Sequence, residues 1–190
     1  NSIVATDQFV YVSNGNNDNI SVIDPKQNKV VESIELLLDE RLKNLKGVIP
    51  FGLTLSPDQK RLYVAEAGIN AVGVIDLESG QMVGHIPTGW FPSKLKVTPD
   101  GKQLILTGNA TLSQHPDREL EGHIYLCNTD GSNLKKILGE EGKNYNSPVI
   151  SPSGKWLAFQ FGNTSFVSIP ALAIMPLNGT TKDMILIPFD

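Results

Sequence analysis

The chain has 190 residues, of which 40% are hydrophobic and 19% charged, and its formal net charge is −4. This is the composition of an ordinary globular protein with enough apolar side chains for a sizeable core. The net negative charge gives no sign of the basic surface that binds nucleic acid. No apolar run approaches the roughly 20 residues of a membrane span. We therefore expect neither nucleic-acid binding nor a membrane-spanning segment.

The most informative feature of the sequence is an internal repeat. Asp24, Asp76 and Asn128 end three equivalent apolar runs and are equally spaced along the chain. A period of about 40 to 50 residues, with about four strands in each unit, is typical of propeller blades. The sequence therefore predicts an all-β fold, a β-propeller of four-stranded antiparallel blades, with about four blades in this chain.

The predicted blades follow one another along a single module that covers residues 1–190. Their approximate ranges are 1–36, 51–87, 92–138 and 147–187. A long insertion over 37–50 separates the first two blades, and its near-helical leucine spacing predicts a loop with one helical turn. A polar, unpatterned loop over 109–122 interrupts the third blade.

The second repeat shows how one blade is built. Its predicted strands run over Phe51–Leu55, Arg61–Glu66, Ala71–Asp76 and Gln81–Ile86. The inner strands carry apolar residues on both faces, and the outer strand is more polar, as a blade between two neighbours requires. Tight turns rich in Pro, Asp, Ser and Gly separate the strands, because these residues favour turn geometry.

Two sequence stretches resemble known propeller families. YVSNGNNDNISVIDPKQNKVV resembles the YVTN-type β-propeller repeat. The longer run KGVIPFGLTLSPDQKRLYVAEAGINAVGVIDLESGQMVGHIPTGWFPSKLKVTPDGKQL resembles the propeller that bacterial surface or periplasmic proteins place before an alkaline-phosphatase-like phosphoesterase domain. From His123 onward, IYLCNTDGSN and SPVISPSGKWLAFQ are similar to TolB-type blades and to the propellers of prolyl-oligopeptidase-family serine peptidases.

The resemblances imply more blades than the repeat supplies. About four blades fit in this chain, whereas these families are understood to use six to eight. A half-ring would expose blade faces and strand edges, which proteins normally protect. Two ring sizes stay open: a closed ring of four blades, and a larger ring to which further residues or a partner add blades.

Familiar catalytic and metal-binding patterns are absent from the sequence. It contains no Gly-x-Ser-x-Gly elbow, no phosphate-binding GxxxxGK[ST] loop and no HExxH or paired-cysteine motif. The Asn14–Asn19 loop offers oxygen ligands for calcium but only one carboxylate, Asp18, so a hairpin turn is the favoured interpretation. The three histidines are scattered, and Cys127 is expected to be a small buried residue. We therefore predict no catalytic residues, metal ligands or cofactor.

The best candidate for a binding site is the aromatic pair Trp90 and Phe91, between the second and third blades. Connections from an outer strand to the next inner strand gather at one face of a propeller, where aromatic side chains can stack on a ligand. Packing of Trp90 between blades is the alternative. Loops expected at the same face hold Glu66, Asn70, Arg41 and Asn163, for which simple solvation is the alternative.

Two functions follow from this interpretation. The first is a non-catalytic binding or scaffold module that presents its channel face to a protein or peptide partner, or to a fused or neighbouring catalytic domain. The resemblance implies a periplasmic, cell-surface or secreted location for it. The second is the substrate-gating propeller of a hydrolase, either a phosphoesterase or a prolyl-oligopeptidase-type peptidase, whose catalytic domain lies outside this chain. Fold alone does not choose between them.

Overall fold

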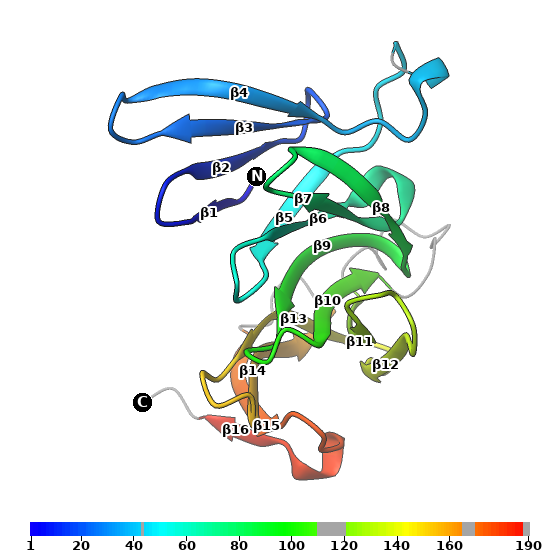
Figure 1. Ribbon diagram of the computed structural model, residues 1–190. Helices are drawn as coiled ribbons and strands as arrows, with labels where there is room; N and C mark the ends of the chain where they lie inside the picture. Colours follow the sequence, from blue (N-terminus) through cyan, green and yellow to red (C-terminus); the bar gives the residue numbers. More distant parts are fainter. Residues whose placement is uncertain (43, 110–120, 165–169, 188–190) are drawn as a thin grey trace. The chain divides into compact units, whose positions relative to one another are not determined.

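A computed structural model describes the chain except for residues 43, 110–120, 165–169 and 188–190 (Figure 1). Most of the predicted 109–122 loop and His115 therefore lie outside the described residues. The chain divides into two compact units, Asn1–Leu95 and Lys96–Asp190, and each is described by itself.

The first unit begins with a four-stranded antiparallel sheet, here named blade 1. Its strands follow in chain order and are β1 (Ile3–Ala5), β2 (Val10–Asn14), β3 (Asn19–Asp24) and β4 (Lys29–Glu35). A short 3-10 helix, η1 (Glu40–Leu42), lies in the connection that follows, as the leucine spacing of this segment predicts. The other described residues of that connection, up to the next strand, have no regular secondary structure.

Blade 2 repeats the same meander within the first unit. Its strands are β5 (Pro50–Leu55), β6 (Arg61–Glu66), β7 (Ala71–Asp76) and β8 (Gln81–Pro87), with the 3-10 helix η2 (Ala67–Ile69) between β6 and β7. The predicted bounds of the second and third strands are confirmed residue for residue.

Apolar side chains from both blades form one core in the first unit. Alternate residues of a strand point to the same face of its sheet. Blade 1 contributes Tyr11, Ile20 and Val22 to the core, and blade 2 contributes Leu62 and Ile75. These side chains are at most 5% exposed, so the two sheets pack face to face as adjacent blades do.

The remaining strands form two further sheets of the same kind. Blade 3 contains β9 (Trp90–Val97), which begins in the first unit, β10 (Gln103–Asn109), β11 (Gly122–Asn128) and β12 (Lys135–Leu138). Blade 4 contains β13 (Lys143–Ile150), β14 (Trp156–Asn163), β15 (Ala171–Pro176) and β16 (Ile185–Ile187), with η4 (Thr181–Asp183) before its last strand.

Blades 3 and 4 share the core of the second unit. Ile124 and Leu126 of β11 pack with Leu157 and Phe159 of β14, and all four are at most 1% exposed. Cys127 is also buried, as predicted, and burial raises the pKa of its thiol to about 11. It is therefore a protonated, unreactive packing residue at neutral pH.

Candidate functional site

The connections of the first unit bring four segments to one end of blades 1 and 2. In a meander, the turn from the second to the third strand lies at the same end as the connection to the next sheet. We name this end the connection end and define it by residues 15–18, 36–49, 67–70 and 88–91 (Figure 1). It contains Arg41, Asn70, Trp90 and Phe91, four of the residues that the sequence singles out.

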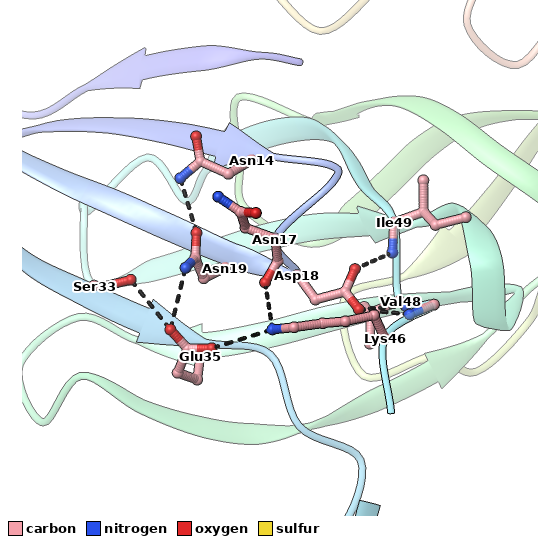
Figure 2. A network of polar contacts seen from close by, with 10 residues as sticks. Asn14, Asn17, Asp18, Asn19, Ser33, Glu35, Lys46, Val48 and Ile49 are labelled. Carbon is pink, nitrogen blue, oxygen red and sulfur yellow. Dashed lines mark hydrogen bonds and ion pairs between the residues drawn. The ribbon is translucent and has the colours of Figure 1, made fainter. Parts of the chain in front are cut away.

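Asp18 anchors the long connection between blades 1 and 2. Its carboxylate accepts hydrogen bonds from the backbone N–H groups of Gly47 (2.6 Å), Val48 (3.1 Å) and Ile49 (2.9 Å), as Figure 2 shows for the last two. Burial raises the pKa of this carboxyl, but the three backbone donors and nearby Lys46 outweigh it and hold the pKa below its usual value. Asp18 is therefore an ionised residue that fastens a connection, in agreement with the turn interpretation of this loop.

The same connection is held from its other side by η2. The backbone N–H groups of Ala67 and Gly68 donate to the carbonyl oxygens of Ile49 (3.1 Å) and Val48 (2.9 Å). A side chain at Gly68 would collide with the Gly47 carbonyl oxygen, so glycine is required for this close approach. Residues 47–49 are thus bound to blade 1 through their N–H groups and to blade 2 through their carbonyls.

A network of side chains continues this anchoring onto blade 1 (Figure 2). Lys46 Nζ donates to the Asn17 carbonyl oxygen at 2.7 Å and lies 3.9 Å from Glu35 Oε2. Asn19 Nδ2 donates to Glu35 Oε1 at 3.1 Å, and Asn19 Oδ1 accepts from Asn14 Nδ2 at 2.8 Å. The connection therefore has a fixed path over the end of blade 1.

Asn70 makes the corresponding contact at the start of blade 3. It immediately precedes β7, as Asp18 precedes β3, and both residues have positive φ angles, of 57° and 55°. Asn70 Oδ1 accepts the Phe91 N–H at 2.9 Å, and its carbonyl oxygen accepts the Thr88 N–H at 2.9 Å. The Phe91 ring packs edge-on against Phe51, with 5.7 Å between centroids. Asn70 and Phe91, two predicted site residues, are thus brought into direct contact.

Trp90 lies next to this clamp and stays exposed. Its exposed fraction is 42%, although Phe91 is half-buried and Pro92 is buried. Positive φ at Phe91, 51°, is unusual for a bulky residue and is maintained here by the Asn70 and Phe51 contacts. The ring of Trp90 therefore projects from a backbone that is fixed on both sides.

Arg41 is exposed at the same end of the unit. Its guanidinium pairs with Asp39, with 2.7 Å between Nη2 and Oδ2, and 88% of its side chain is accessible. Among the described residues, no recorded contact joins it to Trp90, Phe91 or Asn70. Asn163, the other candidate, belongs to the second unit, where its Oδ1 accepts from Lys143 Nζ at 2.7 Å.

An apolar hollow of about 230 Å³ lies within the connection between blades 1 and 2. We name it the leucine hollow. Its lining includes Leu36, Leu37, Leu38, Leu42, Leu45 and Ile69. Leu38, Leu42 and Leu45 are 49%, 40% and 69% exposed, which is unusual for three neighbouring leucines. A second hollow, of about 300 Å³, lies beside the Thr6–Phe9 turn at the opposite end of these blades and has a more polar lining.

Glu66 requires a correction to the sequence interpretation. The sequence suggests Glu66 as a binding residue in a loop at the channel face, with simple solvation as the alternative. It is instead the last residue of β6, where the predicted strand Arg61–Glu66 ends, and its side chain is fully buried. Its Oε2 lies 2.7 Å from His85 Nδ1 on β8, and its Oε1 has no hydrogen-bond partner among the described residues. The hydrogen bond to Glu66 raises the pKa of His85, and burial only partly opposes this effect.

A glycine in the strand between them makes this pair possible. Gly73 of β7 pairs directly with His85 of β8, and the Glu66 side chain crosses the space above it. A Cβ at Gly73 would lie 2.5 Å from Glu66 Oε1, which is closer than real Cβ atoms come to an oxygen. The sequence presents Glu66, Gly73 and His85 as three unrelated residues, so only the strand register reveals them as one unit.

The described residues contain neither a cluster of three or more His, Cys, Asp or Glu side chains that could hold a metal ion nor a helix long and apolar enough to cross a membrane. The Asp18 carboxylate anchors the connection between blades 1 and 2, and the Glu66–His85 pair joins β6 to β8 across Gly73. The exposed groups at the connection end remain available for binding.

The meandering four-stranded sheets define the class of protein: the chain has a β-propeller fold, and its described residues form four blades. The family model for the methylamine dehydrogenase heavy chain (MADH) matches residues 2–92. No curated protein matches the chain in sequence. These findings confirm the predicted fold class but not the resemblance to the YVTN-type repeat.

Solved structures with similar folds come from proteins of several kinds. Kuenenia stuttgartiensis hydrazine synthase is 16% identical, with a TM-score of 0.60 over 100% of this chain and 66% of that chain. A chain of the nidogen/laminin complex is 13% identical, with a TM-score of 0.64 over 90% of this chain and 59% of that one. TolB from Acinetobacter baumannii is 20% identical, with a TM-score of 0.59 over 94% of this chain and 39% of that one. This chain thus spans two thirds or less of these relatives, and at such identities the likeness concerns the fold alone.

Proposed function

We propose that this chain is a non-catalytic β-propeller module that binds a protein or peptide partner through its connection end. The observation that carries the proposal is the exposed Trp90 ring on a backbone fixed by the Asn70–Phe91 hydrogen bond. Aromatic side chains that are rigid before binding lose little conformational entropy in a complex, and tryptophan is enriched among residues that dominate interface energies.

The leucine hollow supplies the second part of the proposed surface. It lies on the connection from β4 to β5, at the same end of the first unit as Trp90. Three leucines that are 40–69% exposed on an anchored segment form an apolar patch of the kind that marks interaction sites. A partner segment with large apolar side chains, spaced to reach Trp90 and the hollow, fits this surface best.

The location proposed for the module is outside the cytoplasm, in the periplasm, on the cell surface or secreted. This part rests on the resemblance of the IPFG, AEAGINAV and HIPTGWFPS segments to propellers of bacterial surface or periplasmic proteins. The partner is either a separate protein or a neighbouring domain of a longer polypeptide. Both would meet the same exposed side chains.

The proposal can be tested by selecting peptides from a random phage-displayed library on the immobilised chain. Selection should enrich peptides rich in Leu, Phe or Trp, and Trp90→Ala should abolish capture of the enriched phage. Trp156→Ala is the matched control, because Trp156 is equally exposed, at 44%, but belongs to blade 4. Enrichment that survives Trp90→Ala and is lost with Trp156→Ala would overturn the assignment of the surface.

A further inference from the structure

A groove lies between blades 1 and 2 at the end opposite to the connection end. The turns β1–β2, β5–β6 and β7–β8 meet there, because every second turn of a meander lies at the same end of its sheet. Two hollows of about 300 and 150 Å³ adjoin one another at this place, since both are lined by Phe9, Tyr11, Leu77 and Glu78. We name the two hollows together the acidic groove.

Hydrogen bonds fix the turns that frame the acidic groove. The Thr6 N–H donates to the Phe9 carbonyl oxygen at 2.9 Å, and the Phe9 N–H donates to Thr6 Oγ1 at 3.0 Å. The Asp7 N–H donates to Gln59 Oε1 at 3.1 Å, which ties this turn of blade 1 to a turn of blade 2. The groove is therefore framed by backbone that is ordered before a ligand binds, and this lowers the entropic cost of binding.

Three of the four charged side chains that line the acidic groove are carboxylates. Asp7, Glu32 and Glu78 are exposed, and their carboxylates form no hydrogen bond or ion pair among the described residues. Lys60 is the fourth charged residue of the lining. Glu32 extends from blade 1 towards blade 2, because a Cβ at Gly80 would lie 3.2 Å from Glu32 Oε1. Carboxylates from both blades thus surround one groove, whose potential attracts a cation.

A buried hydroxyl group gives an independent sign of a ligand. Tyr11 is only 5% exposed and lines both hollows, and its hydroxyl has no hydrogen-bond partner among the described residues. Buried polar groups normally have a partner, because an unpaired one has lost its bonds to water. Burial, assisted by the charge of Glu32, raises the pKa of Tyr11, so its hydroxyl stays neutral and can both donate and accept a hydrogen bond. The acidic groove therefore holds unused hydrogen-bonding capacity.

The remaining lining of the acidic groove is largely apolar. Phe9 and Leu77 are half-buried, and Val22 is buried. A β-bulge in β4 leaves Val31 without a pairing partner on β3, and Val31 lines the groove next to Glu32. The groove thus combines apolar contacts with negative charge. Its best complement is a side chain with an apolar stem and a cationic end.

We propose that the acidic groove binds an arginine side chain of a protein or peptide, as a second binding site opposite to the connection end. The guanidinium lies between the carboxylates of Glu32 and Glu78 and donates a hydrogen bond to the Tyr11 hydroxyl. The methylene stem packs on Phe9 and Leu77. Arginine is favoured over lysine, because its planar group has five donors that can reach several acceptors at once and is more weakly hydrated than an ammonium.

The test is an NMR titration of the isotope-labelled chain with the blocked peptide acetyl-Gly-Gly-Arg-Gly-Gly-amide. The backbone amide resonances of Asp7, Phe9, Tyr11 and Glu78 should shift in a saturable way. The same peptide with citrulline in place of arginine should bind about tenfold more weakly or less, because citrulline has a similar shape but no charge. Equal binding of the two peptides, or shifts confined to other parts of the chain, would overturn the proposal.

Variants of the chain separate this site from a general attraction to an acidic protein. Glu78→Lys should weaken binding of the arginine peptide by about tenfold or more, whereas Glu141→Lys, the same change of charge at an exposed residue outside the groove, should have little effect. Tyr11→Phe should weaken binding about threefold or more, with folding checked by circular dichroism. Equal effects of the two lysine variants would contradict the site. Trp90→Ala should leave this titration unchanged, so the groove and the connection end are tested separately.

Discussion

Asn70 and Phe91 form the same contact as Asp18 and Ile49, at the equivalent position of the preceding blade. In each pair, a side-chain oxygen of a residue with positive φ accepts the backbone N–H of the residue before a proline, at 2.9 Å. Ile49 and Phe91 both have positive φ as well, 53° and 51°. The propeller repeat thus includes a polar clamp between the middle of one blade and the beginning of the next.

Substitutions of Asn70 separate two features of this clamp: the positive φ of residue 70 and the side-chain oxygen that accepts the Phe91 N–H. Asn70→Gly keeps the positive φ but loses the acceptor, and we expect it to lower the free energy of unfolding by about 1 kcal/mol. Asn70→Ala loses both and should cost about 2 kcal/mol or more. Asn70→Asp keeps both and should stay within about 0.5 kcal/mol of the parent. Urea unfolding gives these values, and equal costs for the Gly and Asp variants would contradict a role for the hydrogen bond.

Removal of the Asp18 carboxylate should lower the free energy of unfolding more than removal of an exposed aspartate in the same blade. Asp18→Ala leaves three backbone N–H groups without their acceptor and should cost about 2–4 kcal/mol in urea unfolding. Asp24→Ala is the control, because Asp24 contacts only its own exposed turn, through Lys26 and Gln27. Similar costs for both variants would show that the anchored connection contributes little.

The acid limb of the stability curve gives an independent check on Asp18. Its folded-state pKa lies below the unfolded value, so its contribution is present above that unfolded value, near 3.8, and is lost as the pH falls through the folded pKa. Asp18→Asn should therefore lose stability relative to the parent at neutral pH and approach it at low pH. A constant difference between pH 7 and pH 2 would be inconsistent with an ionised Asp18 at the clamp.

The space above Gly73 can be tested with a double-mutant cycle. Gly73→Ala should cost about 1–3 kcal/mol, because its Cβ meets the Glu66 carboxylate, and this cost should fall by at least about 1 kcal/mol when Glu66 is already Ala. Gly84→Ala in β8 is the matched control, since its Cβ meets nothing within 4 Å. The interpretation fails if Gly73→Ala costs the same in both backgrounds.

The Glu66–His85 pair should make stability depend on pH above the ordinary histidine range. The hydrogen bond to Glu66 raises the folded-state pKa of His85 above its usual value of 6.5. Its contribution is therefore fully present below about pH 6.5 and is lost as the pH rises through the folded pKa. Glu66→Gln should remove this slope, which chemical unfolding at several pH values between 6 and 9 would reveal. A slope that persists in Glu66→Gln must arise from another group.

The sequence predicted the strands of blade 2 well because each strand is bounded on both sides by residues that favour turns. Arg61–Glu66 and Ala71–Asp76 coincide with β6 and β7 for this reason. It could not predict the burial of Glu66, because a charged residue at the end of a strand is expected to be exposed unless a buried hydrogen-bond partner is known. That partner, His85, is reached only across Gly73, and the relation depends on the register of three strands.

The role of Asp18 was missed for a related reason. Within its own loop, Asp18 is one of several turn-forming residues, and a hairpin turn explains it adequately. The backbone N–H groups that donate to its carboxylate lie 29 to 31 residues further along the chain, at Gly47, Val48 and Ile49. The equal spacing of Asp18 and Asn70 from the ends of their repeats was the one signal available, and it indicates equivalent positions without revealing their contacts.

The proposed binding surface is tested most directly by the affinity of the chain for its selected peptide. Isothermal titration should show that Trp90→Ala weakens binding by about 30-fold or more, as expected when an interface loses a dominant tryptophan. Its melting temperature should stay close to that of the parent, because Trp90 is 42% exposed. Trp156→Ala should bind within about twofold of the parent. Unchanged affinity together with a lower melting temperature in Trp90→Ala would contradict the account and identify Trp90 as a packing residue.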